Sequence, residues 1–138
     1  MSSFKDLRIV DNFYQTSLFF PMPTVIISTL TPDGKTTLGP YSLVQPYYVA
    51  GKDFYAMLLN CRNSSNTAQN ILRTGKCALN FIPDDRKFFK EAVKLSWPGD
   101  TPEEKMPKCS YVLEPGLRAE ADPAGEYPLV LRDAFQVI

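Results

Sequence analysis

The residues best suited to chemistry lie in one run of this 138-residue chain, NCRNSSNTAQNILRTG, from Asn60 to Gly75. An arginine and several hydroxyl and amide side chains stand directly before a helix-forming segment. A helix N-terminus carries unpaired backbone N–H groups and a partial positive charge, so it attracts capping oxygens and anions alike. The run predicts an ordinary helix cap or a phosphate site, and the residue types alone leave both open.

The candidate anion ligands combine a guanidinium, which can bind phosphate bidentately, with hydroxyl, amide and backbone N–H groups. They are Arg62, Ser64, Ser65, Asn66 and Thr67. Between Lys52 and Pro83 the only acidic residue is Asp53. An anion therefore meets little repulsion in this part of the chain.

Two further polar clusters stand at the ends of predicted strands, LGPYS from Leu38 to Ser42 and NFIPDD from Asn80 to Asp85. In the first, Gly39 and Pro40 interrupt a strand, which suggests that a flat ligand approaches the backbone there. A β-bulge or a barrel corner would account for the same glycine.

Composition excludes several kinds of chemistry. The chain has no histidine, so Ser-His-Asp and Cys-His catalysis and histidine zinc sites are excluded within it. Its three cysteines, Cys61, Cys77 and Cys109, form no C-x-x-C motif, which argues against a disulfide framework or a thiolate metal site. If the protein is an enzyme, a bound cofactor is expected to supply the reactive group, with no catalytic side chain and no metal.

Charge and hydropathy restrict the expected partners and location. The 15 basic and 15 acidic residues cancel, so no general basic surface predicts binding to nucleic acid or to a membrane. No apolar run approaches the roughly 20 residues that cross a bilayer, and the first residues lack a secretory signal. We expect a cytoplasmic protein.

Strand and helix signals alternate irregularly. A hairpin is predicted over PTVIISTLTPDGKTTLGPYSLVQP, with its turn at residues 32–35, and a third strand over 53–60 with both faces covered. A helix is predicted over 65–74 and ends at Gly75, followed by a strand in KCALNFIP and an amphipathic helix in DDRKFFKEAVKLS.

The last third of the chain reads as an irregular loop followed by strands. Residues 97–107 predict a surface loop, and KCSYVLEPGLRAEA and YPLVLRDAFQVI predict strands. The chain stops within the last of these, so we expect that a further strand is missing or is supplied by a partner.

These elements predict a single domain over residues 1–138, mainly β with peripheral helices, and a β-barrel rather than a doubly wound parallel sheet. The order and spacing of the hairpin, DFYAMLLN, NSSNTAQNI, GKCALNFIP and YPLVLRDAFQVI resemble the flavin reductase-like proteins, which have an FMN-binding split barrel. The resemblance covers most of residues 20–138. It implies a split barrel that lacks its last strands here, and a homodimer with flavin at the subunit interface.

The resemblance also implies roles for individual residues. It puts the FMN phosphate at Arg62 and Ser64 to Thr67, and the ribityl chain near Asn60 and Cys61. The ring would lie against Leu38, Gly39, Pro40, Tyr41 and Ser42, mainly through backbone groups, with Thr29 nearby.

The activity implied is hydride transfer from NAD(P)H to FMN, with FAD as a possible substitute, and onward to a small-molecule acceptor. Two alternatives stay open. One is a flavin-storing or electron-transfer module that does not turn over a nicotinamide. The other is a cofactor-free dimeric interaction domain.

Overall fold

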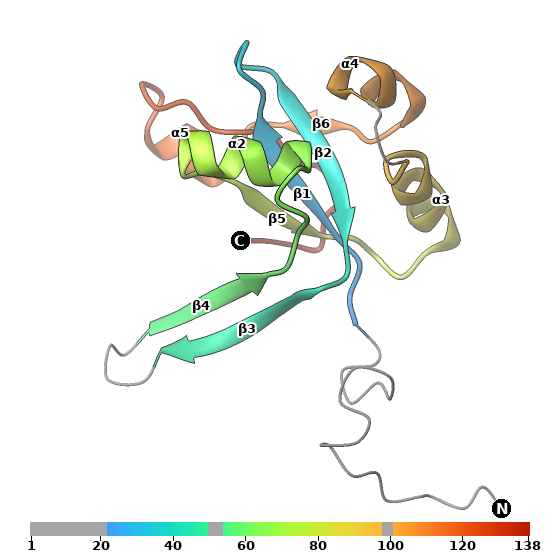
Figure 1. Cartoon of the computed structure of the whole chain (residues 1–138), viewed down its shortest axis with the longest axis horizontal. Helices are drawn as coiled ribbons and strands as arrows, with labels where there is room; N and C mark the ends of the chain where they lie inside the picture. The colour runs from blue at the N-terminus through green and yellow to red at the C-terminus, as the bar shows by residue number, and fades with distance from the viewer. Residues whose placement is uncertain (1–21, 50–53, 98–100) are drawn as a thin grey trace, which may run out of the picture.

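The computed structural model describes residues 22–49, 54–97 and 101–138. Its main sheet has four strands in the order β2-β1-β5-β8, all paired antiparallel. These strands are β1 (Val25–Leu30), β2 (Thr36–Tyr41), β5 (Ala78–Phe81) and β8 (Gln136–Val137). Helix α2 (Asn66–Thr74) packs against β1 and β2, and helix α3 (Arg86–Lys94) packs against β2 (Figure 1).

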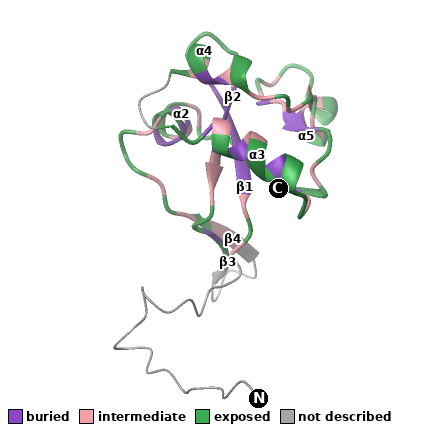
Figure 2. Cartoon of the chain, turned by 90° about the vertical axis from the view of Figure 1, so that its right-hand side faces the viewer, coloured by how far each residue is buried: buried purple, intermediate pink, exposed green. Residues whose placement is uncertain are grey.

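Strand β1 is the centre of the core, and all six of its residues are buried (Figure 2). Because side chains alternate between the faces of a strand, β1 supports two hydrophobic clusters. Ile26 packs in one cluster with Phe88 and Ala92 of α3, whereas Val25 and Ile27 belong to the other. The predicted hairpin between β1 and β2 is confirmed, with Gly34 at a φ of 77° in its turn.

Helix α2 begins and ends where the sequence predicts. Ser65 is its N-cap and accepts a hydrogen bond from the Ala68 N–H, and Gly75 ends it in the left-handed conformation. On the side facing the sheet, Asn70 donates to Thr29 Oγ1 over 3.1 Å, and Arg73 donates to the Leu30 carbonyl. Helix α2 is therefore fixed relative to β1 by polar contacts as well as by packing.

The predicted hairpin continues into a strand that the sequence did not separate from β2. The chain leaves β2 at Tyr41. Among the described residues, β3 (Val44–Val49) pairs only with β4 (Phe54–Leu59), in a two-stranded ribbon that projects from the body (Figure 1). The expectation that the third predicted strand has both faces covered is wrong for the single chain. Leu58 is 44% exposed, and Leu43 just before β3 is 51% exposed.

The last third of the chain departs most from expectation. Residues 97–107 include a short helix, α4 (Pro102–Lys105), and the start of a 3₁₀ turn, η1 (Met106–Lys108), rather than a loop alone. The strand predicted over 108–121 is reduced to β6 (Leu113–Glu114), followed by α5 (Leu117–Ala121). The final predicted strand divides into β7 (Val130–Leu131), which pairs with β6, and β8, which pairs with β5.

The described residues form a mixed α/β fold with antiparallel sheets, and within them the sheets do not close into a barrel. The expectation of a mainly β barrel is therefore corrected to this coarser class. Two of the elements read as strands in the sequence are helical or very short, which reduces the β content. Within the described ranges, no helix has the length and apolar character needed to cross a membrane.

Candidate functional site

One cleft of about 570 Å³ brings the first two sequence clusters together. We call it the α2 cleft, because its wall includes the first turn of α2. The rest of the lining comes from the end of β2, from the residues just before α2, from the residues that follow α3, and from α4 with its N-cap. The lining residues are Gly39, Pro40, Tyr41, Arg62, Ser64, Ser65, Asn66, Thr67, Leu95, Ser96, Trp97, Thr101 and Lys105. All five candidate phosphate ligands and three residues of LGPYS thus share one site.

The N-cap of α2 links the two clusters directly. The Tyr41 hydroxyl lies 3.4 Å from Ser65 Oγ, within hydrogen-bond distance, and Ser65 Oγ also accepts from the Ala68 N–H over 3.1 Å. The backbone N–H groups in the first turn of any helix have no acceptors within the helix itself. Thus Ser65 acts as an ordinary cap, while neighbouring donors of the same turn remain suited to an anion.

Gly39 has a structural explanation that the sequence did not supply. It is buried in β2 and paired regularly with Ile27, so it is neither a bulge nor a corner. A Cβ added to it would lie 2.8 Å from Thr67 Oγ1 and 3.0 Å from a Tyr41 ring carbon. The absence of a side chain at Gly39 therefore allows the first turn of α2 to pack closely against β2 beside the α2 cleft.

We expect Gly39→Ala to lower the free energy of unfolding by about 1–2 kcal/mol, because the added methyl overpacks this contact. Urea unfolding measures the change. In a Thr67→Ala background the obstructing oxygen is gone, so the same substitution should cost less than half as much. Equal costs in the two backgrounds would contradict the proposed contact.

Five predicted site residues lie outside the lining of the α2 cleft. Thr29 and Leu38 are fully buried, the first under Asn70 of α2 and the second in the core cluster with α3, so neither side chain is accessible to a ligand. Ser42 is exposed and lines a shallower hollow of about 270 Å³ beside Pro40 and Tyr41. The remaining two, Asn60 and Cys61, are exposed and half-buried, respectively.

The wall opposite α2 was missed by sequence reasoning. It consists of Leu95, Ser96 and Trp97 after α3, with Thr101 and Lys105 around α4. The signal in the sequence is TPEE, since Thr101 and Glu104 form a capping box with Pro102 at the start of α4. Lys105 is only 6% exposed despite its charge, whereas Trp97 is 66% exposed at the rim of the cleft.

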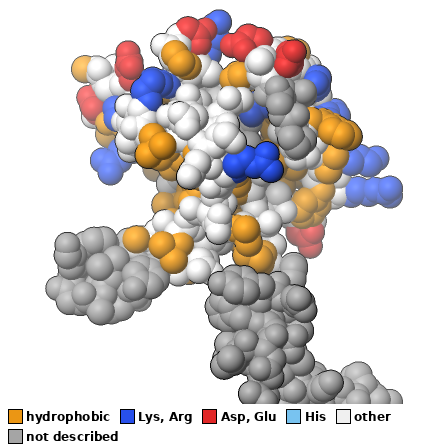
Figure 3. Space-filling view, in the orientation of Figure 1, with side chains coloured by type: hydrophobic (Ala, Val, Ile, Leu, Met, Phe, Trp, Pro, Cys, Tyr) orange, Lys and Arg blue, Asp and Glu red, His pale blue; other side chains and the backbone are white. Residues whose placement is uncertain are grey.

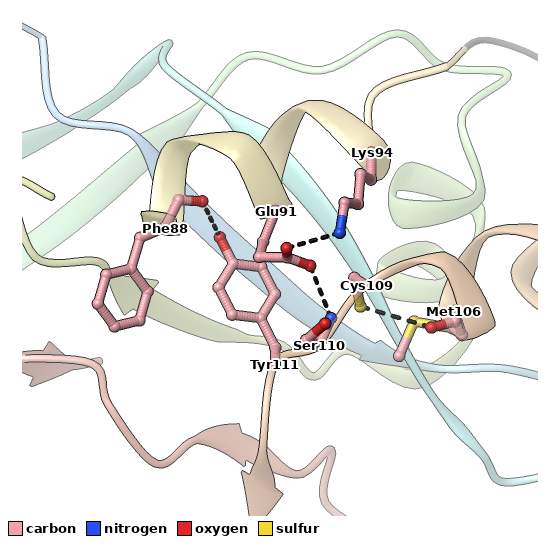
Figure 4. A network of polar contacts seen from close by, with 7 residues as sticks. All are labelled: Phe88, Glu91, Lys94, Met106, Cys109, Ser110 and Tyr111. Carbon is pink, nitrogen blue, oxygen red and sulfur yellow. Dashed lines mark hydrogen bonds and ion pairs between the residues drawn. The ribbon is translucent and has the colours of Figure 1, made fainter. Parts of the chain in front are cut away.

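A polar network joins α3 to the segment that follows η1 (Figure 4). Glu91 accepts hydrogen bonds from Lys94 Nζ over 2.6 Å and from the Ser110 N–H over 2.7 Å. The Tyr111 hydroxyl donates to the Phe88 carbonyl over 2.6 Å. These bonds fix the segment that follows η1, and through it the position of α4 and Lys105.

The network also shifts the pKa values of its members. The hydrogen bond from Lys94 lowers the pKa of Glu91 below its usual value of 4.5, with a smaller lowering effect from Ser110. Burial raises the pKa of the Tyr111 hydroxyl far above 10, and burial also raises the pKa of the Cys109 thiol. Tyr111 and Cys109 are therefore neutral at physiological pH and act as packing and hydrogen-bonding groups.

A pH-dependent stability follows from Glu91. Because its pKa is lower in the folded state, its contribution is fully present above about pH 4.5 and is lost as the pH falls through the lowered value. We expect Glu91→Gln to cost about 1 kcal/mol at pH 7 and to reduce the acid dependence of stability. Thermal unfolding between pH 3 and pH 7 measures both effects, and Glu120→Gln on the exposed face of α5 is the control. An unchanged acid dependence would contradict the assignment.

Charge around the α2 cleft differs from that of the surface as a whole. Figure 3 shows acidic and basic side chains interspersed over the upper part of the molecule, in keeping with the balanced composition. In contrast, the described residues that line the cleft include Arg62 and Lys105 but no acidic residue. The charged side chains in the described part of the lining are therefore basic.

The fold and the cleft define a mixed α/β protein with antiparallel sheets and a cleft beside a helix N-terminus. No protein-family model matches the chain. No curated protein sequence matches it either. Among solved structures, its fold is similar to that of Pseudomonas fluorescens 2-nitrobenzoate 2-nitroreductase NbaA, with a TM-score of 0.62 over 95% of this chain. The two are 16% identical, and the match spans 59% of the NbaA chain, so the similarity concerns the fold.

Proposed function

We propose that the protein is an FMN-binding oxidoreductase of the flavin reductase type, which transfers hydride from NAD(P)H to flavin and on to an acceptor. The observation that carries this proposal is the α2 cleft, where the predicted phosphate ligands and the Gly39-Pro40-Tyr41 segment line one cavity. The fold similarity adds support, because the similar protein is named as a nitroreductase and the proposed chemistry is also reductive.

The lining residues fit the phosphate of FMN. A phosphomonoester has several acceptor oxygens and a charge near −2 at neutral pH. The first turn of α2 offers N–H groups and the Thr67 hydroxyl, and Ser64 before the helix offers a second hydroxyl. Arg62 adds a fork of donors. No described lining residue is acidic, so the donor set is not opposed by a carboxylate.

The segment from Pro40 to Ser42 would hold the other end of the cofactor. It borders both the α2 cleft and the hollow lined by Phe89 and Val93, which is mainly apolar. Proline has no N–H, so the backbone N–H groups of Tyr41 and Ser42 are the donors available to a ring in this segment. FMN, when bound, supplies the redox chemistry, and this chain binds it, orients it and excludes water from one side.

We further propose that the protein is a homodimer in a flavin reductase-like split-barrel fold. The β3–β4 ribbon supports this, since Leu43 is exposed just before β3 and Leu58 is exposed within β4. Figure 3 shows apolar side chains on the face where the ribbon joins the body. A second copy would cover this apolar surface and complete the flavin site at the interface.

The test uses the full chain, purified and mixed with FMN, then with NADH or NADPH without oxygen. Bound flavin whose absorbance bleaches on adding the nicotinamide supports the proposal. Bound flavin that does not bleach with either nicotinamide would instead identify a storage or electron-transfer module. A protein that binds no flavin would overturn the proposal.

A further inference from the structure

We infer that the hollow beside α3 binds a small, neutral aromatic molecule, and that such a molecule is the electron acceptor of the proposed reaction. This α3 hollow is the one of about 270 Å³ that Ser42 lines together with Pro40 and Tyr41. The inference rests on the proposed function and names a substrate class for it.

The α3 hollow adjoins the α2 cleft. Pro40, Tyr41 and Ser96 line both of them. A flavin ring held by the segment from Pro40 to Ser42 would therefore lie beside any ligand in the hollow. Hydride transfer requires the two reactants to be in contact and correctly oriented, so this position suits the second reactant.

The outer face of α3 forms the apolar wall of the hollow. Phe88 and Ala92 are buried and pack in the core cluster, whereas Phe89 is 36% exposed and Val93 is 60% exposed. Phe89 and Val93 are one helical turn apart, so their side chains are neighbours on the surface of the helix. Both line the hollow. A flat ring placed there would cover the exposed apolar surface of both and could stack on, or meet the edge of, the Phe89 ring.

Charge distinguishes the hollow from the α2 cleft. Among the described residues that line the hollow, none carries a charge, whereas the lining of the α2 cleft includes Arg62. A carboxylate transferred from water to an uncharged apolar surface loses hydration without gaining a partner, which costs free energy. The cleft therefore suits the phosphate of the cofactor, and the hollow suits a ring without charge.

Both walls of the hollow are held in place by the protein itself. The Tyr41 hydroxyl lies 3.4 Å from Ser65 Oγ, and Tyr41 packs against the core cluster that contains Val25 and Ile27. On the α3 side, the Phe88 carbonyl accepts a hydrogen bond from the Tyr111 hydroxyl over 2.6 Å. Walls that are ordered before the ligand binds lower the entropic cost of binding.

The size of the hollow limits the ligand. Sites for drug-sized molecules usually occupy roughly 300–1,000 Å³, so a hollow of about 270 Å³ suits a smaller molecule, such as one substituted benzene ring. Nitrobenzene belongs to this class. A hydride that originates from NAD(P)H and a proton from water would convert it to nitrosobenzene and water, while the nicotinamide is oxidised to NAD(P)⁺.

The experiment titrates the full chain, with FMN bound and no nicotinamide present, with nitrobenzene and with 4-nitrobenzoate. These probes share a ring and differ by one carboxylate. Amide chemical shifts in NMR spectra locate the binding site and measure the affinity. We expect nitrobenzene to shift the signals of Phe89 and Val93 and to bind about tenfold more tightly than 4-nitrobenzoate.

Two substitutions on α3 test the wall directly. We expect Phe89→Ala to weaken nitrobenzene binding about tenfold, because the aromatic contact is lost. Val93→Lys should reverse the preference, so that 4-nitrobenzoate binds at least as tightly as nitrobenzene. The control is Leu72→Lys, at a position 77% exposed on α2 and outside the lining of both the cleft and the hollow, which should change neither affinity. Thermal unfolding confirms that each variant is folded.

Shifts confined to other parts of the chain, or equal affinities of the wild type for the two probes, would overturn the inference and leave the proposed function intact. Release of FMN by nitrobenzene would also overturn it, because the hollow would then hold the flavin ring itself. If the wild type binds no FMN, the proposed function fails, and the same titration of the flavin-free protein decides whether the hollow binds aromatic rings. Shifts at Phe89 and Val93 that Val93→Lys weakens and Leu72→Lys does not would support that site, and their absence would overturn it.

Discussion

Replacing Arg62 with alanine and Thr67 with valine together is expected to lower FMN affinity by about 100-fold. Riboflavin affinity should change by less than about threefold, since riboflavin lacks the phosphate these side chains would bind. The difference between the two ligands is the informative quantity, because damage to the fold would weaken both. Fluorescence titration of the purified protein with each flavin measures it.

The choice of substitutions follows from the surroundings of each residue. Arg62 is exposed, so truncation removes a charge without leaving a cavity. Thr67 is 3% exposed and its hydroxyl faces Gly39, so valine removes the hydroxyl while filling the same space. The matched control is Arg118→Ala on α5, which removes an exposed arginine outside the α2 cleft.

Three outcomes can be told apart. A selective loss of FMN binding supports a phosphate site at the start of α2. Equal losses for both flavins would show that the run only caps the helix and supports the fold. Unchanged binding of both would mean that the phosphate lies elsewhere, and the α2 cleft would lose its assigned role.

The start of α2 could be predicted from sequence because its signals are local. Ser65 is a preferred N-cap residue, Gly75 is a preferred terminator, and the residues between them have helical spacing. The hairpin of β1 and β2 is equally local, since turn residues and β-branched strands stand next to each other in the chain. In both cases the determining contacts lie within a few residues.

The opposite wall of the cleft depends on contacts between distant parts of the chain. Lys105 comes to the cleft because the segment after η1 is bonded to α3, through Ser110 to Glu91 and Tyr111 to Phe88. Residue types do not specify such pairings. The same limit applies to Gly39, whose role becomes visible only when Thr67 is found against it.

The polar cluster NFIPDD illustrates a different limit. Its first residue, Asn80, looked like one of several polar groups gathered at strand ends, and a polar residue in a strand is compatible with a binding site. In the structure Asn80 is fully buried, and Asp85 serves as the N-cap of α3. Residue type cannot distinguish a buried structural amide from a ligand-binding one, because both use the same hydrogen-bonding groups.

Asn80 is the site of the largest expected effect on stability. Its Nδ2 donates to the Ile26 carbonyl and to Ser28 Oγ, each over 2.8 Å, and its Oδ1 accepts from the Leu131 N–H over 2.9 Å. One amide thus joins β5 to β1 and to β7, inside the core. Asn80→Leu would leave buried partners without hydrogen bonds, and we expect a loss of about 3–4 kcal/mol in the free energy of unfolding.

Urea unfolding measures this loss, with Asn63→Leu at an exposed position as the control that should change stability by less than about 0.5 kcal/mol. A second variant distinguishes the cost of unpaired hydrogen-bonding partners from the cost of altered packing. Ser28→Ala in the Asn80→Leu background removes one orphaned hydroxyl, so the double variant should be more stable than the sum of the single changes predicts. Simple additivity, or a loss below 1 kcal/mol for Asn80→Leu, would contradict the network.

Because β7 is anchored through Leu131, the substitution should also release the β6–β7 pair, which hydrogen exchange at Leu131 would detect as early loss of protection.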